Sequence, residues 1–127
     1  MTGSPPKTVN STLQAIGNTP LVKLNRIVPE GSADIYVKLE YYNPTGSKKD
    51  RMALGMIEGA EARGELIEGM SVVEYSGGST GASLAFICAI KGYHFHIISG
   101  DCFGQEKLDT MNAFGADLEV IKSPDGK

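Results

Sequence analysis

The sequence predicts an α/β fold, an open and mainly parallel twisted sheet with helices on both faces. After residue 43, strand-like segments alternate with helical ones, and short loops containing glycine connect them. The segment Ala82–Ile90 is almost entirely apolar, as is typical of a helix buried between a sheet and another layer.

Residues 9–42 are expected to form a leading part with a short helix and two strands. The helix should end at Gly17, because glycine readily adopts the left-handed conformation that closes helices. The expected elements are a helix over Val9–Ile16 and strands over Leu21–Leu24 and Asp34–Glu40.

The next element is predicted as a helix over Ser47–Arg63, with Gly64 as its C-terminal cap. Ser47 is expected to cap its N-terminus, with Asp50 at the third helical position. An apolar stripe recurs near helical spacing and consists of Met52, Met56 and Ala60, with Leu54 and Ile57.

The remaining residues repeat a strand–helix pattern. The expected strands are Ser71–Tyr75, Phe95–Ser99 and Asp117–Lys122, and the expected helices are Ser79–Lys91 and Gln105–Phe114. Ligands of such sheets bind beyond the carboxyl ends of the strands. Two loops that follow the strands ending near Glu40 and Tyr75 are therefore the places to look for a site.

Bulk composition indicates a globular protein, and the expected localisation is cytoplasmic. The 127 residues suffice for a single α/β domain, or they are a fragment of a longer protein: 1–8 as a flexible tail, 9–42 as the leading part and 43–127 as βα repeats. The net charge of −3 gives no reason to expect nucleic acid or a membrane as partner.

Cys88 and Cys102 lack metal-site or redox spacing and are interpreted as reduced thiols. His94 and His96 share a strand face, where a half-exposed surface is favoured over a metal pair.

The first loop, Asn43–Arg51, places Lys48 and Lys49 at the start of a helix. A primary amine held there can condense with an aldehyde cofactor, since free amides and the helix dipole disfavour its protonated form. The alternative is a solvated surface pair. Successive helical residues point about 100° apart, so only one of the two lysines can face a pocket.

The second loop, Ser76–Gly81, fits an anion-binding nest or a tight turn that caps a helix, and its sequence does not decide between them. Its G-x-S-x-G pattern also matches a hydrolase elbow with Ser79 as nucleophile, but no histidine follows His96 to complete the triad. It fits neither the dinucleotide fingerprint nor the phosphate P-loop.

Several segments together resemble the cysteine synthase and cystathionine β-synthase family of fold-type II pyridoxal phosphate enzymes. The first is Ile16–Leu24, which reads IGNTPLVKL, and the second is Lys38–Arg51, similar to the family's KLE…NP-x-G-S-x-K-D-R pattern. The resemblance continues through Gly55–Ile57, Glu74–Gly81, Ala89–Tyr93 and Phe114–Ala116.

The resemblance implies the N-terminal part of a tryptophan synthase β-like fold and pyridoxal 5'-phosphate as cofactor. Lys49, directly before Asp-Arg, falls on the catalytic Schiff-base lysine, and Ser79 on a position that contacts the cofactor. The residues implied to bind the α-carboxylate of the substrate are Ser76, Gly77, Gly78, Ser79 and Thr80. The implied reaction joins sulfide to an O-activated serine such as O-acetylserine to form cysteine, in an enzyme that is commonly a homodimer.

The chain departs from this family in its second loop and in its length. Ser79 replaces an asparagine, Gly77 replaces a serine, and Lys48 replaces an apolar residue. The family's larger C-terminal part, which carries the loop for the cofactor phosphate, is not found within residue 127. The chain alone is therefore expected to be inactive. A cystathionine β-synthase-like enzyme and a catalytically silent truncated paralogue that acts as a binding partner remain alternatives.

Overall fold

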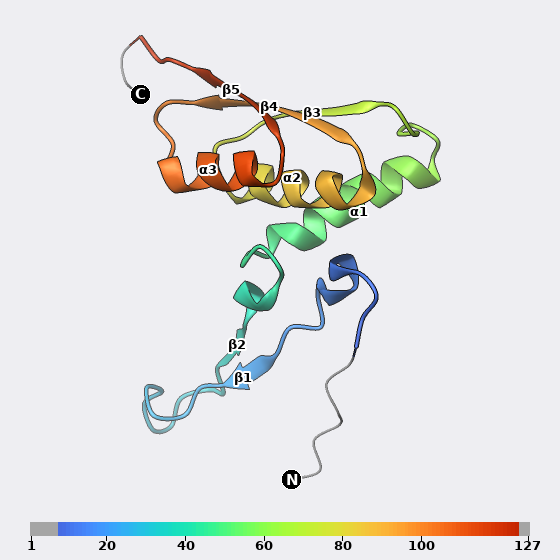
Figure 1. Ribbon diagram of the computed structural model, residues 1–127. Coiled ribbons are helices and arrows are strands. Elements are labelled where there is room, and N and C mark those ends of the chain that lie inside the picture. Colours follow the sequence, from blue (N-terminus) through green and yellow to red (C-terminus); the bar gives the residue numbers. More distant parts are fainter. Residues whose placement is uncertain (1–7, 125–127) are drawn as a thin grey trace.

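The computed structural model describes residues 8–124, so all but the last residue of the expected tail, residues 1–8, lies outside the described part (Figure 1). In chain order the elements are η1 (Thr12–Ala15), β1 (Leu21–Lys23), β2 (Tyr36–Lys38), η2 (Glu40–Tyr42), α1 (Lys49–Ala62), β3 (Ser71–Tyr75), α2 (Ser79–Lys91), β4 (His94–Gly100), α3 (Gln105–Ala113) and β5 (Asp117–Ile121). The η elements are 3₁₀ helices.

The predicted parallel α/β fold is confirmed by a sheet in the order β3-β4-β5, in which both strand pairs are parallel. In Figure 1 the described helices all lie on one side of this sheet, with α2 and α3 below the strands and α1 beyond α2. Because the strands are added in one direction, right-handed crossovers place both connecting helices on the same face. The opposite face, where helices were also expected, leaves Val73 and Tyr75 each 61% exposed.

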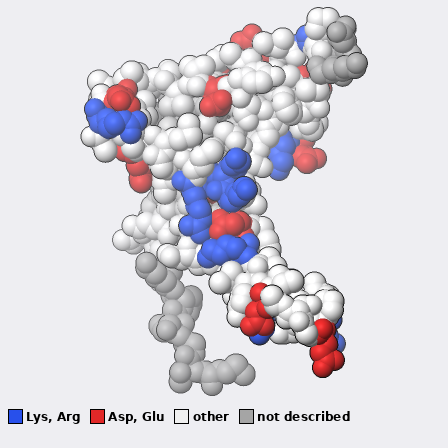
Figure 2. Space-filling view, turned by 180° about the vertical axis from the view of Figure 1, so that it is seen from behind, with Lys and Arg blue, Asp and Glu red and all other residues white. Residues whose placement is uncertain are grey.

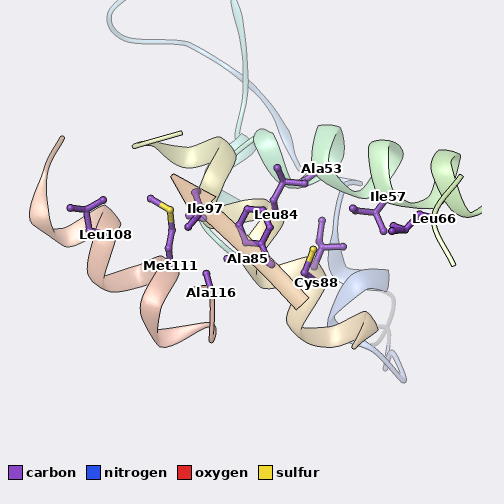
Figure 3. Close-up of a cluster of buried hydrophobic side chains, with 13 residues drawn as sticks. Ala53, Ile57, Leu66, Leu84, Ala85, Cys88, Ile97, Leu108, Met111 and Ala116 are labelled. Atoms are coloured by element: carbon purple, nitrogen blue, oxygen red, sulfur yellow. The ribbon is translucent and has the colours of Figure 1, made fainter. Parts of the chain in front are cut away.

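The core lies between the helices and the covered face of the sheet (Figure 3). α2 forms its centre, since Leu84, Ile87 and Cys88 are almost completely buried. Within residues 8–124, no helix has the length and apolar character needed to cross a membrane.

The predicted apolar stripe of α1 is wrong in part. Ala53 and Ile57 are buried against the core, but Met56 is 48% exposed. α1 carries apolar residues on more than one side, and the position of α2 decides which side is buried.

An antiparallel hairpin of β1 and β2 extends away from the helices (Figure 1). All of its strand residues are exposed. The second strand is shorter than the predicted Asp34–Glu40, because Glu40 begins η2 and its carboxylate binds Arg51. The predicted helix over Val9–Ile16 is reduced to η1, in which the Leu13 amide donates to the Ser11 hydroxyl oxygen.

Candidate active site

The first part of the first loop, residues 43–48, is called the lysine turn here. It leads directly into α1, which begins at Lys49. Lys48 is exposed and Lys49 is half-buried, so the two side chains differ in environment, as their helical spacing predicts. Within the described part of the chain, neither amine has a hydrogen bond or an ion pair. Lys49 therefore presents an unpaired amine on the first residue of α1.

The expected N-terminal cap by Ser47 is not formed in the predicted way. Lys48 is the capping residue and makes no side-chain capping bond, while the Ser47 hydroxyl accepts a 3.1 Å hydrogen bond from the Lys49 amide. Asp50 does not act in a capping box either, because its carboxylate accepts from the Thr45 amide at 2.8 Å and from the Thr45 hydroxyl.

Asp50 connects the lysine turn to α2. Its side chain is fully buried, and it also accepts a 2.6 Å hydrogen bond from the Ser83 hydroxyl. Ser83 lies one helical turn after Ser79, at the start of α2. These bonds hold the start of α1 against the first turns of α2, the helix that directly follows the second loop. Sequence reasoning missed this connection, although a serine inside the apolar run of α2 is a usable signal.

A second polar network ties the leading part of the chain to α1. Arg51 forms an ion pair with Glu40, with 2.9 Å between Nε and Oε2, and the Thr19 hydroxyl donates to the same carboxylate at 2.7 Å. Asn43 is buried and binds both Glu40 and the amide of Gly17. Hydrogen bonds from Arg51, Thr19 and Asn43 lower the pKa of Glu40 to about 2. Basic and acidic atoms meet at this junction between the hairpin and the helices (Figure 2).

The second loop leaves several hydrogen-bond donors without acceptors. The Ser76 hydroxyl oxygen accepts from the amides of Gly78 at 3.3 Å and Gly81 at 3.2 Å, so it braces the loop internally. Between residues 8 and 124, the backbone amides of Gly77, Ser79 and Thr80 find no acceptor. These amides are available to an anion, as the anion-nest interpretation requires.

The predicted cofactor contact, Ser79, is the first residue of α2 and is half-buried. A triad with a histidine is not supported. His94 pairs with Ser71 at the amino end of β3, whereas Ser79 follows its carboxyl end. His96 binds Asp117, with 2.8 Å between Nδ1 and Oδ2, on the exposed face of the sheet.

The family match and the individual relatives of this chain agree with each other. Residues 12–127 match the family described as "Pyridoxal-phosphate dependent enzyme". A cysteine synthase of Staphylococcus aureus (strain Mu50 / ATCC 700699) is 48% identical over 112 residues, covering 88% of this chain and 36% of the relative. The chain thus spans just over a third of the length of this curated relative.

Solved structures show the same relationship. The crystal structure of a hydrogen sulfide-producing enzyme from Fusobacterium nucleatum superposes with a TM-score of 0.87 at 40% identity, over 94% of this chain and 39% of that one. O-ureido-L-serine synthase superposes with a TM-score of 0.86 at 40% identity and the same coverage. The match over nearly the whole chain, in sequence and in fold, shows that this chain belongs to the pyridoxal-phosphate-dependent enzyme family.

Proposed function

We propose that the chain is the part of a cysteine synthase-like enzyme that carries the catalytic lysine and the substrate loop. The substrate loop is the second loop, Ser76–Gly81. The proposed reaction replaces the leaving group of an O-activated serine, such as O-acetylserine, with sulfide to form cysteine. One observation carries it: the half-buried, unpaired Lys49 starts the helix that Asp50 joins to α2, where the amides of the substrate loop are open. The cysteine synthase of S. aureus supports the choice of reaction.

The residues present fit the cofactor. Pyridoxal phosphate needs a primary amine for attachment and polar groups beside its ring, and Lys49 and Ser79 supply these. Ser99, near the carboxyl end of β4, is also buried, and within residues 8–124 its hydroxyl oxygen has no hydrogen-bond partner. When bound, the cofactor supplies an electron sink for the carbon from which a proton is removed.

The side chains of this chain then have separate tasks. Lys49 would hold the cofactor through its side-chain amine, and the same amine, once free, would accept the α-proton of the substrate. The amides of Gly77, Ser79 and Thr80 bind the α-carboxylate, at a helix N-terminus that favours negative charge. The Asp50–Ser83 hydrogen bond keeps the Lys49 amine and the substrate loop in a fixed relative position.

A different nucleophile is the nearest alternative. O-ureido-L-serine synthase and the hydrogen sulfide-producing enzyme match this chain with the same identity and coverage. This similarity supports β-substitution as the class of reaction, with more than one candidate nucleophile. A cystathionine β-synthase-like reaction falls in the same class. Because the chain alone is expected to be inactive, product analysis with sulfide, hydroxyurea and homocysteine as competing nucleophiles separates these reactions when the chain is assayed within an active enzyme.

Covalent trapping tests the attachment site without requiring turnover. The full chain is incubated with excess pyridoxal phosphate and reduced with borohydride, and the modified peptide is identified by mass spectrometry. We expect modification at Lys49, its loss in Lys49→Ala, and its retention in Lys48→Ala, which is the matched control one residue earlier. Modification that persists in Lys49→Ala, or that favours Lys48, would contradict the proposal.

A further inference from the structure

The aromatic ring of Phe103 occupies the space that a side chain at position 77 would need. Gly77 is buried in the loop between β3 and α2, and Phe103 lies in the loop between β4 and α3. A Cβ atom built on Gly77 would lie 1.8 Å from Cγ and 1.9 Å from Cδ2 of the Phe103 ring. Any residue larger than glycine at position 77 therefore requires the ring to move.

The backbone of Gly77 does not itself demand glycine. Its φ lies outside the left-handed region, which is adopted by seven other glycines among the described residues. The neighbouring Gly78 has open space around its Cβ position, with nothing within 4 Å. The restriction at position 77 is thus steric, and it comes from the ring.

The same ring reaches the end of β4. A Cβ on Gly100 would lie 3.6 Å from Cε2 of Phe103, an ordinary contact distance, and the Phe103 amide donates to the Gly100 carbonyl at 3.4 Å. Phe103 as a whole residue is 37% exposed, while one side of its ring lies against Gly77. The ring thereby connects the carboxyl ends of β3 and β4, the two places where the sheet turns into helix N-termini.

We propose that Phe103 is a positioning residue for the carboxylate-binding loop: its ring stands in for the side chain of residue 77 and fixes the backbone from which the open amides point. The amides of Gly77, Ser79 and Thr80 can converge on one carboxylate only while this backbone is held. The choice of a carboxylate as ligand rests on the proposed function, whereas the ring–glycine contact does not.

A double-mutant cycle on the full chain tests the contact. Circular dichroism gives the melting temperature of the native chain, Gly77→Ala, Phe103→Ala and the double variant. Gly77→Ala should lower the melting temperature by about 5 °C or more, since inserting a methyl group into a filled space is destabilising. In the Phe103→Ala background the same substitution should have little effect, because the ring is gone.

Gly78→Ala is the matched steric control for stability and should change the melting temperature far less than Gly77→Ala. An equal effect of Gly77→Ala in both backgrounds would overturn the contact. So would equal effects of Gly77→Ala and Gly78→Ala.

Ligand binding separates positioning from simple stabilisation. The 13.5 kDa chain suits ¹H–¹⁵N NMR, in which acetate, as the carboxylate probe, should shift the amide signals of Gly77, Ser79 and Thr80. Phe103→Ala should weaken this binding by about tenfold at a temperature where the variant is fully folded. Phe103→Tyr retains the ring and should bind acetate like the native chain.

Native-like acetate binding by Phe103→Ala would overturn the positioning role, as would an absence of amide shifts in the native chain. The proposed function fails by a separate observation, the absence of cofactor attachment at Lys49. The two ideas can therefore be rejected independently.

Discussion

The Ser83 hydroxyl donates a 2.6 Å hydrogen bond to Oδ1 of Asp50, and this bond joins α2 to the start of α1 inside the core. Asp50 is fully buried, yet no cation contacts it in residues 8–124. The carboxylate is held by neutral donors alone, from Thr45 and Ser83. The bond matters for the site because Asp50 follows Lys49 directly, so it anchors the residue next to the lysine to α2.

Removing this carboxylate should be costly. Asp50→Ala leaves the Thr45 amide and two hydroxyl groups without their acceptor in a buried site, and should lower the free energy of unfolding by about 2–4 kcal/mol. Urea unfolding at pH 7 measures it. Ser83→Ala should cost only about 1 kcal/mol, because the carboxylate keeps both Thr45 donors. A larger loss for Ser83→Ala than for Asp50→Ala would show that the carboxylate is not the centre of the network.

Acid should weaken the junction between the hairpin and α1. The pKa of Glu40 is lowered from 4.5 to about 2, first by its hydrogen bond with Arg51 and then by those with Thr19 and Asn43. A carboxyl with a lowered pKa contributes stability that is fully present above pH 4.5 and is lost as the pH falls through about 2. The urea midpoints of the native chain and Glu40→Gln should therefore differ at pH 6 and converge toward pH 2. A difference that stays constant over this range would contradict the assignment.

The two thiols should react at very different rates. Cys102 is exposed, whereas Cys88 is buried in the core, and burial raises the pKa of the Cys88 thiol to about 11. A disulfide reagent at pH 8 should modify one thiol quickly and the second only after denaturation. Cys102→Ser should remove the fast reaction, and Cys88→Ser should leave it unchanged. Fast labelling of the Cys102→Ser chain would mean that the core opens easily.

Two helical glycines should respond oppositely to substitution by alanine. A Cβ on Gly81 would lie 2.4 Å from Cδ1 of Ile97 and 2.7 Å from Sδ of Met111, so Gly81→Ala should destabilise the chain by about 1–3 kcal/mol. Gly55 in α1 has nothing within 4 Å of its Cβ position. Gly55→Ala should stabilise by about 0.5–1 kcal/mol through its higher helix propensity. Thermal unfolding of both variants checks the pair, and a stabilising Gly81→Ala would show that the side chains beneath it can move aside.

Local signals in the sequence predict much of the fold. The bounds of α2 agree with the prediction at both ends, since a glycine-rich loop precedes a long apolar run and Gly92 closes it with φ of +80°. The three strands of the parallel sheet agree within one residue at each end. The short elements agree less well with the prediction. The alternating pattern predicts Glu40 in a strand, but Glu40 begins η2 and pairs with Arg51, 11 residues later.

The candidate site was predicted as two separate loops. Lys48 and Lys49 could be distinguished in principle by helical spacing, but only the packing of α1 decides that Lys49 is the half-buried one. Asp50 was interpreted as a helix cap, because a capping box is a local pattern. Its actual bond to Ser83 spans 33 residues, and Phe103 likewise meets Gly77 only through the fold.

The sequence by itself determined the order and type of the main elements, the family resemblance and the two loops, because caps, glycines and apolar periodicity act over a few neighbouring residues. The tertiary structure decided which side of α1 is buried, which donors stay open in the second loop, and how Asp50 and Phe103 join distant segments. These outcomes depend on steric fit and hydrogen bonding between parts of the chain that meet only after the sheet has formed, and no local pattern encodes them.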